Sequence, residues 1–181
     1  MKINILDTEQ LYMEMLTLPD VDRAAFFDEK IMQPFAPVFV RLSMPRDPYA
    51  LGCLALSGTD STMKEMLAQL HEADAWTKAQ KTVAYAESRL QDSGIPLPDA
   101  LVLGLFLANP VIFEESRGYS GLGSCPGYIQ IVIAPNAYNL PRLPSCVAHE
   151  FHHNVLFNNV TWNFMNVRLS QYLAVEGLAE S

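Results

Sequence analysis

Residues 149–153 combine two histidines and a glutamate at a spacing that suits a metal-dependent hydrolase. The segment is His149-Glu150-Phe151-His152-His153, which matches the pattern H-E-x-x-H. Residues four apart share one face of an α-helix, so His149 and His153 can present two imidazoles to one metal ion. Glu150 lies beside that line, where its carboxylate can take a proton from a metal-activated water. The pattern therefore predicts a Zn²⁺ site with Glu150 as the general base.

A catalytic zinc site usually has three protein ligands and one open position. Glu176 follows His153 by 23 residues, a gap that accommodates the end of the first helix, a turn and a second helix packed across it. We therefore expect Glu176 to be the third ligand. Glu180, four residues further along the same face, is expected to accept a hydrogen bond from the far nitrogen of a ligating histidine. The alternative for both glutamates is a solvated helix face.

His152 and two tyrosines are candidates for supporting roles. His152 lies three residues from His149 and could also reach a metal, but the pair four residues apart is the better template. We therefore predict that His152 supports the site rather than binding the metal. Hydrolysis of a peptide bond also needs a group that stabilises the oxyanion. The sequence offers Tyr172 and Tyr119 as candidates, and the group can also lie beyond Ser181.

These motifs resemble the gluzincin class of metallopeptidases, in which the third zinc ligand is a glutamate on the next helix. More narrowly, the whole chain resembles a bacterial family of predicted zinc-dependent proteases. The resemblance rests on Ala148 to His153, on the Gly-rich turn and apolar strand from Gly121 to Ile133, and on Val175 to Glu180. It implies a zincin-like fold, a zinc cofactor and a peptide or protein substrate. Members of the family continue well beyond this point, whereas this chain stops at Ser181, and both a natural end and a truncation remain open.

In metallopeptidases of the resembled class, a strand just before the zinc helix borders the cleft and pairs with the extended substrate. Residues 128–133, with the sequence YIQIVI, are the clearest strand candidate because they are rich in β-branched side chains. The resemblance implies four substrate-binding residues in this strand: Tyr128, Ile129, Gln130 and Ile131. It also implies a flap at residues 121–127. The alternative is an ordinary core strand.

The remaining patterns predict an α+β fold, with N-terminal helices and a small mixed sheet packed on the zinc helix. Helices are expected over residues 7–18, 21–32, 62–72, 75–92 and 144–157, followed by a connector at 162–167 and a last helix that carries Glu176. Strands are expected over residues 38–43, 100–107 and 128–133, and a polar, Gly-rich loop at 114–124. We predict one domain over residues 1–181, with a mainly helical lobe at 1–97 and the sheet and zinc-site helices at 98–181.

Composition narrows the function further. Half of the residues are hydrophobic, which suits a sizeable core, and the net charge of −8 argues against binding nucleic acid. The longest apolar run, at 100–108, is too short to span a bilayer, and no signal peptide is expected at residues 1–10. Three scattered cysteines, Cys53, Cys125 and Cys146, are typical of reduced thiols in a cytoplasmic protein.

Three functions remain open at this point. The first is a zinc peptidase in which Glu150 is the general base. The second is a zinc hydrolase similar to deformylases, with Cys125 as a thiolate ligand, although the residues around Cys125 lack the sequence that such enzymes carry. The third is a non-catalytic peptide-binding or regulatory protein on a metallopeptidase scaffold. The sequence makes no prediction of the oligomeric state.

Overall fold

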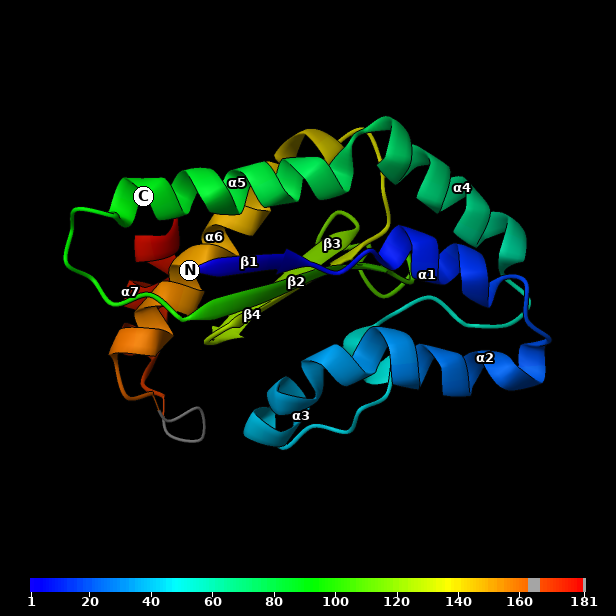
Figure 1. Cartoon of the computed structure of the whole chain (residues 1–181), viewed down its shortest axis with the longest axis horizontal. Coiled ribbons are helices and arrows are strands. Elements are labelled where there is room, and N and C mark those ends of the chain that lie inside the picture. Colours follow the sequence, from blue (N-terminus) through cyan, green and yellow to red (C-terminus); the bar gives the residue numbers. More distant parts are fainter. Residues whose placement is uncertain (163–166, 181) are drawn as a thin grey trace.

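A four-stranded mixed sheet forms the centre of the molecule (Figure 1). The computed structural model describes residues 1–162 and 167–180. The strands are β1 (Lys2–Ile5), β2 (Ala100–Leu107), β3 (Tyr119–Cys125) and β4 (Tyr128–Ile133). Their order across the sheet is β1-β2-β4-β3; β1, β2 and β4 are parallel, and β3 is antiparallel to β4. The two edges of the sheet are therefore β1 and β3.

Seven α-helices lie in the described part of the chain. They are α1 (Thr8–Met15), α2 (Asp20–Phe26), α3 (Ala36–Leu42), α4 (Asp60–Glu72), α5 (Ala75–Leu90), α6 (Leu143–Asn159) and α7 (Leu169–Ala179). A π-helical segment (Phe27–Met32) and a 3₁₀ turn (Gln33–Phe35) join α2 to α3, and further 3₁₀ turns span Tyr49–Leu51 and Leu140–Arg142. None of these helices combines the length and hydropathy that a membrane span requires.

The helices cover the two faces of the sheet unequally. In Figure 1, α5 lies along one side of the sheet and α2 and α3 along the other. Side chains alternate between the faces of a strand, so Ile129 and Ile131 of β4 face α6. Phe106 and Tyr128 face the opposite way, where the ring of Phe35 packs on both at centroid distances of 5.4 and 6.2 Å. A single cluster of buried apolar side chains thus links the N-terminal helices to the sheet and α6.

The local patterns predicted most of these elements. The predictions over residues 7–18, 62–72, 75–92, 100–107, 128–133 and 144–157 are confirmed, with ends shifted by a few residues. The helix expected over 21–32 continues from α2 into the π-helical segment. The connector expected at 162–167 lies largely outside the described residues.

Three predictions of local structure were wrong. Residues 38–43, expected as a strand, belong to α3, because the helix places Val38 and Phe39 in the core. The strand β1 was missed; its four residues gain their hydrogen-bond partners from β2, almost a hundred residues away. The loop expected at 114–124 contains most of β3, which is stabilised by its pairing with β4. Because β1 joins the sheet, residues 1–97 and 98–180 share one sheet.

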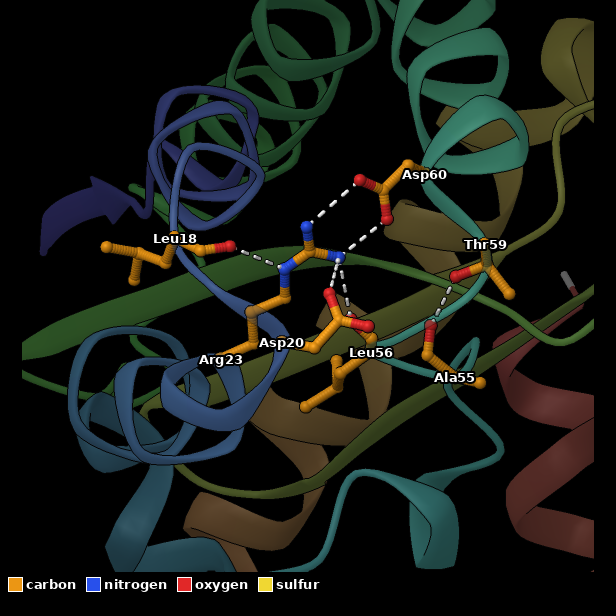
Figure 2. A network of polar contacts seen from close by, with 7 residues as sticks. All are labelled: Leu18, Asp20, Arg23, Ala55, Leu56, Thr59 and Asp60. Atoms are coloured by element: carbon orange, nitrogen blue, oxygen red, sulfur yellow. Dashed lines mark hydrogen bonds and ion pairs between the residues drawn. The ribbon is translucent and has the colours of Figure 1, made fainter.

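A buried arginine ties α2 to the start of α4 (Figure 2). The side chain of Arg23 is only 5% exposed, and its guanidinium forms two hydrogen bonds with the Asp60 carboxylate, at 2.6 and 2.9 Å. Its remaining contacts are the carbonyl oxygens of Leu18 and Leu56 and the carboxylate of Asp20. Hydrogen bonding to Arg23 lowers the pKa of Asp60. Such a paired and hydrogen-bonded cation can be buried between helices without leaving a polar group unsatisfied.

Candidate metal centre

Helix α6 carries the H-E-x-x-H residues and is oriented by an apolar stripe. Val147, Phe151 and Val155 recur every four residues and are all buried. This spacing places them on one face of the helix, which packs towards the sheet and α5. His149 and His153 follow two positions after Val147 and Phe151, a rotation of about 200°, so their side chains project from the opposite side of the helix. Pro144 is tolerated in the first turn, where its missing N–H has no intrahelical acceptor.

Three donor atoms converge beside α6. His149 Nε2 and His153 Nε2 are 2.9 Å apart, and Glu176 Oε2 lies 3.2 Å from the first and 3.5 Å from the second. A tetrahedral zinc site with bonds near 2.1 Å separates its ligand atoms by about 3.4 Å. The three residues form a group that could hold a metal ion. Burial and the neighbouring His149 lower the pKa of His153, which favours the neutral imidazole that metals bind.

Helix α7 brings Glu176 and Glu180 to the histidines. Val175 is the buried residue of this helix, and Glu176 follows it directly. One turn further along, Glu180 Oε1 lies 3.2 Å from His149 Nδ1, the ring nitrogen that faces away from the converging donors. This contact can hold the His149 ring in the orientation that metal binding needs. His153 Nδ1 is buried and has no such partner among the described residues.

Glu150 lies next to the converging donors but is not one of them. Its residue is only 7% exposed. Burial raises the pKa of Glu150 to about 7, while the charge of His149 and a hydrogen bond from the backbone of Gly123 act to lower it. A carboxyl group that titrates near neutral pH can both accept and return a proton. His152 also lies outside the donor group; it is half-buried and lines the first of the two cavities described below.

Two glycines on β3 allow α6 to lie against the sheet at the site. Gly121 and Gly123 are two residues apart, so they share one face of the strand. A methyl group at Gly121 would overlap the Glu150 carboxylate, and one at Gly123 would overlap the Glu150 carbonyl. The flap expected at residues 121–127 is therefore wrong, because Gly121 to Cys125 are part of β3 and support the helix. The alternation of glycines in Gly121-Leu122-Gly123 was the signal that could have identified this role.

The side chain of Asn154 connects α6 to the β3–β4 hairpin by hydrogen bonds. This role was not predicted from the sequence. The side chain is completely buried one position after His153. Asn154 Oδ1 accepts a hydrogen bond from Gly127 N at 2.8 Å. Its Nδ2 lies at 2.8–3.0 Å from three carbonyl oxygens, those of Gly123, Cys125 and Tyr128. The polar residue in an otherwise apolar stretch, Asn154-Val155-Leu156-Phe157, was the available signal.

The predicted pairing of β4 with a substrate is contradicted by the sheet. β4 is hydrogen-bonded to β2 on one side and to β3 on the other, so it has no free edge. Ile129 and Ile131 are completely buried, Gln130 is 1% exposed and Tyr128 packs on Phe35. A substrate strand therefore cannot pair with these residues. The edge that lies beside the metal donors belongs to β3.

Two cavities flank Glu150 along β3. The first, of about 890 Å³, is lined by residues that include Tyr119, Gly121, Arg142, Cys146, His149 and His152. The second, of about 570 Å³, is lined by residues that include Gly121, His153, Phe157, Trp162, Tyr172 and Glu176. Gly121, His149 and Glu150 line both cavities, and we refer to the two cavities together as the cleft. Tyr119 and Tyr172, the two oxyanion candidates, lie in the first and second cavity respectively.

Cys125 is not brought to the metal donors. The residue is 2% exposed, and burial raises the pKa of its thiol. The group of converging ligand atoms contains His149, His153 and Glu176 but not Cys125. The structure therefore does not support the deformylase-like alternative. Cys146 lines the first cavity, where burial and the charge of Glu150 raise the pKa of its thiol to about 12.

The close approach of α6 to β3 leads to a prediction for Gly123. Gly123→Ala is expected to lower the free energy of unfolding by about 1–3 kcal/mol, because the added methyl group must push α6 away from β3. Zinc affinity should fall as well, since the same displacement moves His149. Gly177→Ala is the matched control: its added methyl group meets no atom within 4 Å, and alanine favours the helix by about 0.5–1 kcal/mol. Urea unfolding and zinc titration of both variants test this; a Gly123→Ala protein as stable as the wild type would contradict it.

Comparisons with known proteins give a family match and a relative. A family model described as "Predicted Zn-dependent protease (DUF2268)" matches residues 75–181. A protein of Bacillus subtilis (strain 168), described as "Uncharacterized protein YjfC", is 31% identical over 188 residues. The match covers 96% of this chain and 62% of the relative, so the chain spans less than two thirds of that protein's length. No solved structure matches significantly.

Proposed function

Because the chain belongs to the family of predicted Zn-dependent proteases, we propose that it is a zinc-dependent peptidase with a zincin-like active site. The observation that carries the proposal is the convergence of His149 Nε2, His153 Nε2 and Glu176 Oε2 next to the buried Glu150. Three protein ligands leave a fourth position open, as catalytic zinc sites require. The gluzincin type follows from the glutamate on α7 as third ligand.

Glu150 carries the proton transfers in the proposed mechanism. Its carboxylate takes a proton from the attacking water and passes it to the leaving amine. Its raised pKa suits both directions of transfer. The chemistry that zinc supplies when bound is polarisation of the peptide carbonyl and activation of water. Glu180 keeps the His149 ring in place through its contact with Nδ1.

The free edge of β3 is the proposed binding surface for the substrate backbone. β3 is an edge strand; Ser120 and Gly121 line both cavities, and Leu122 lines the second. An extended peptide can add to such an edge by main-chain hydrogen bonds. The peptide would then cross in front of Glu150, because Gly121 lies against that carboxylate. Tyr119 and Tyr172 flank this path and are the proposed stabilisers of the oxyanion.

A peptide library tests the proposal. The chain is stripped of metal with a chelator, reloaded with Zn²⁺, and incubated with the library, and new termini are detected by mass spectrometry. We expect cleavage only after zinc is restored. Peptide binding without cleavage by the zinc-loaded chain would instead support the non-catalytic, peptide-binding function. Equal cleavage with and without zinc would contradict the role of the metal.

A further inference from the structure

Two arginines enclose the ring of Tyr138. Arg142 lines the first cavity, whereas Arg117 and Tyr138 line a separate cavity. The guanidinium carbon of Arg142 lies 3.9 Å from the centroid of the Tyr138 ring, and that of Arg117 lies 4.3 Å from it. Two guanidinium groups at these distances must occupy opposite faces of the ring. Arg142 Nη1 also donates a hydrogen bond to the Tyr138 carbonyl oxygen at 2.8 Å. The positive charge of Arg142 is therefore held in a defined place, although the residue is exposed.

The loops that carry this arrangement are themselves fixed. Arg117 has a positive φ of 59°, which is uncommon for a residue with a side chain. Its carbonyl oxygen accepts hydrogen bonds from the side-chain amides of Asn136 and Asn139, at 3.1 and 3.2 Å. Asn139 is completely buried and also donates to Ala134 O at 2.8 Å. This network holds the strained backbone of Arg117 beside Tyr138.

Arg142 faces the first cavity, together with His149 and Glu150. Among the described residues, neither Arg142 nor Arg117 forms an ion pair with a carboxylate. The charge of Arg142 nevertheless acts on the cavity wall: burial raises the pKa of Tyr119, and Arg142 opposes that rise. The second cavity has a different character, with Phe157, Trp162 and Val175 in its lining. Arg142 is thus the one lysine or arginine among the described lining residues of the two cavities; it shares the first cavity with the carboxyl groups of Glu150 and Glu180.

The direction of a bound peptide follows from the orientation of β3. Antiparallel pairing is more common and slightly more stable than parallel pairing. A peptide antiparallel to β3 has its N-terminal part near Cys125 and its C-terminal part near Tyr119. The C-terminal part then enters the first cavity, where Arg142 lies. The cation and the strand direction therefore indicate the same end of the substrate.

We propose that Arg142 determines substrate specificity by binding a carboxylate on the C-terminal side of the scissile bond. The inference rests on the proposed peptidase function. The carboxylate belongs either to the C-terminus of the peptide or to an acidic side chain, and both sources present the same group to a guanidinium. Arg142 is pre-oriented by Tyr138, so little side-chain freedom is lost when the carboxylate binds. Glu180, which also lines the first cavity, is already engaged with His149.

Matched peptide libraries test this inference on the zinc-loaded chain. The first pair of libraries differs at the C-terminus, which is a free carboxylate in one library and an amide in the other. The second pair differs in a side chain, which is glutamate in one library and glutamine in the other, placed at each position in turn. We expect the peptides that carry the carboxylate to be cleaved with a KM lower by about tenfold, with little change in kcat. The preference should disappear in Arg142→Gln and persist in part in Arg142→Lys. Arg89→Gln, which removes an exposed charge from α5 outside both cavities, is the matched control.

The outcomes separate this inference from the function on which it rests. Equal cleavage of acid and amide peptides by the wild type, or a preference that survives in Arg142→Gln, would overturn the inference and leave the peptidase function intact. If the carboxylate is preferred in only one of the two library pairs, that pair identifies its source: the peptide C-terminus or an acidic side chain. If the zinc-loaded chain cleaves no peptide, the proposed function fails. Binding of the same peptides to the Glu150→Gln protein then decides the inference, since a missing acid preference or a complete lack of binding would overturn it.

Discussion

Glu150→Gln is expected to lower kcat by about 10³-fold or more while the protein still binds zinc. Glutamine is similar in size to glutamate but cannot accept the proton of the attacking water. It also leaves the three converging donor atoms of His149, His153 and Glu176 unchanged. Loss of turnover with unchanged metal content would therefore assign the proton transfer to Glu150 rather than to the metal site as a whole.

The measurement combines peptide cleavage with elemental analysis of the same protein sample. Glu65→Gln provides a matched control, because Glu65 is an exposed glutamate on α4 that lines neither cavity. We expect this control to retain both zinc and activity. Full activity in Glu150→Gln would show that another group is the base. Loss of zinc in that variant would show that Glu150 supports the metal site itself.

His149→Ala is expected to reduce zinc occupancy from about one ion per chain to a small fraction, with an affinity lower by more than about 100-fold. The substitution removes one of the three donors and leaves two, which do not define a stable tetrahedral site. Glu176→Ala also leaves two donors but should weaken binding less severely, since both are imidazoles one turn apart on α6. Glu180→Ala should weaken it by about 10- to 100-fold, because Glu180 only orients the His149 ring.

Zinc titration under competition with a chromophoric chelator measures these affinities. His71→Ala is the matched control, because His71 is an exposed histidine on α4 that contacts Glu9 and lies outside the donor group. We expect it to bind zinc as the wild type does. A folded, zinc-supplemented wild type without metal would contradict the three-ligand site. Unchanged affinity in Glu176→Ala would limit the site to the two histidines.

The spacing of the metal-site residues could be predicted from the sequence because it depends on helix geometry alone. In any α-helix of standard pitch, His149 and His153 lie on the same face because they are four residues apart. The same regularity places Glu180 one turn beyond Glu176 on α7. The long helices and the apolar strand at 100–107 could also be predicted from the sequence, because the pattern that identifies each of them lies within one segment. Helix geometry does not place α7 against α6, which the tertiary structure does.

The elements that were mispredicted depend on partners distant in the sequence. Val38 and Val40 favour a strand locally, yet packing against the core made residues 36–42 a helix. The strand β1 exists because β2 pairs with it. Glycines weaken a strand, so residues 119–125 have a weak local signal. β3 forms through its pairing with β4 and its hydrogen bonds with Asn154 of α6.

The arrangement around the candidate metal centre illustrates the same division. The sequence by itself predicted which residues bind zinc and transfer a proton, because those roles are inferred from residue type and short spacing. Only the tertiary structure decided that β3 rather than β4 borders the cleft, since strand order depends on pairings that no local pattern encodes. It also decided that Gly121 and Gly123 face Glu150 and that Arg142 lines the first cavity. These positions depend on contacts between segments that are distant in the sequence, and such contacts form only when the chain folds.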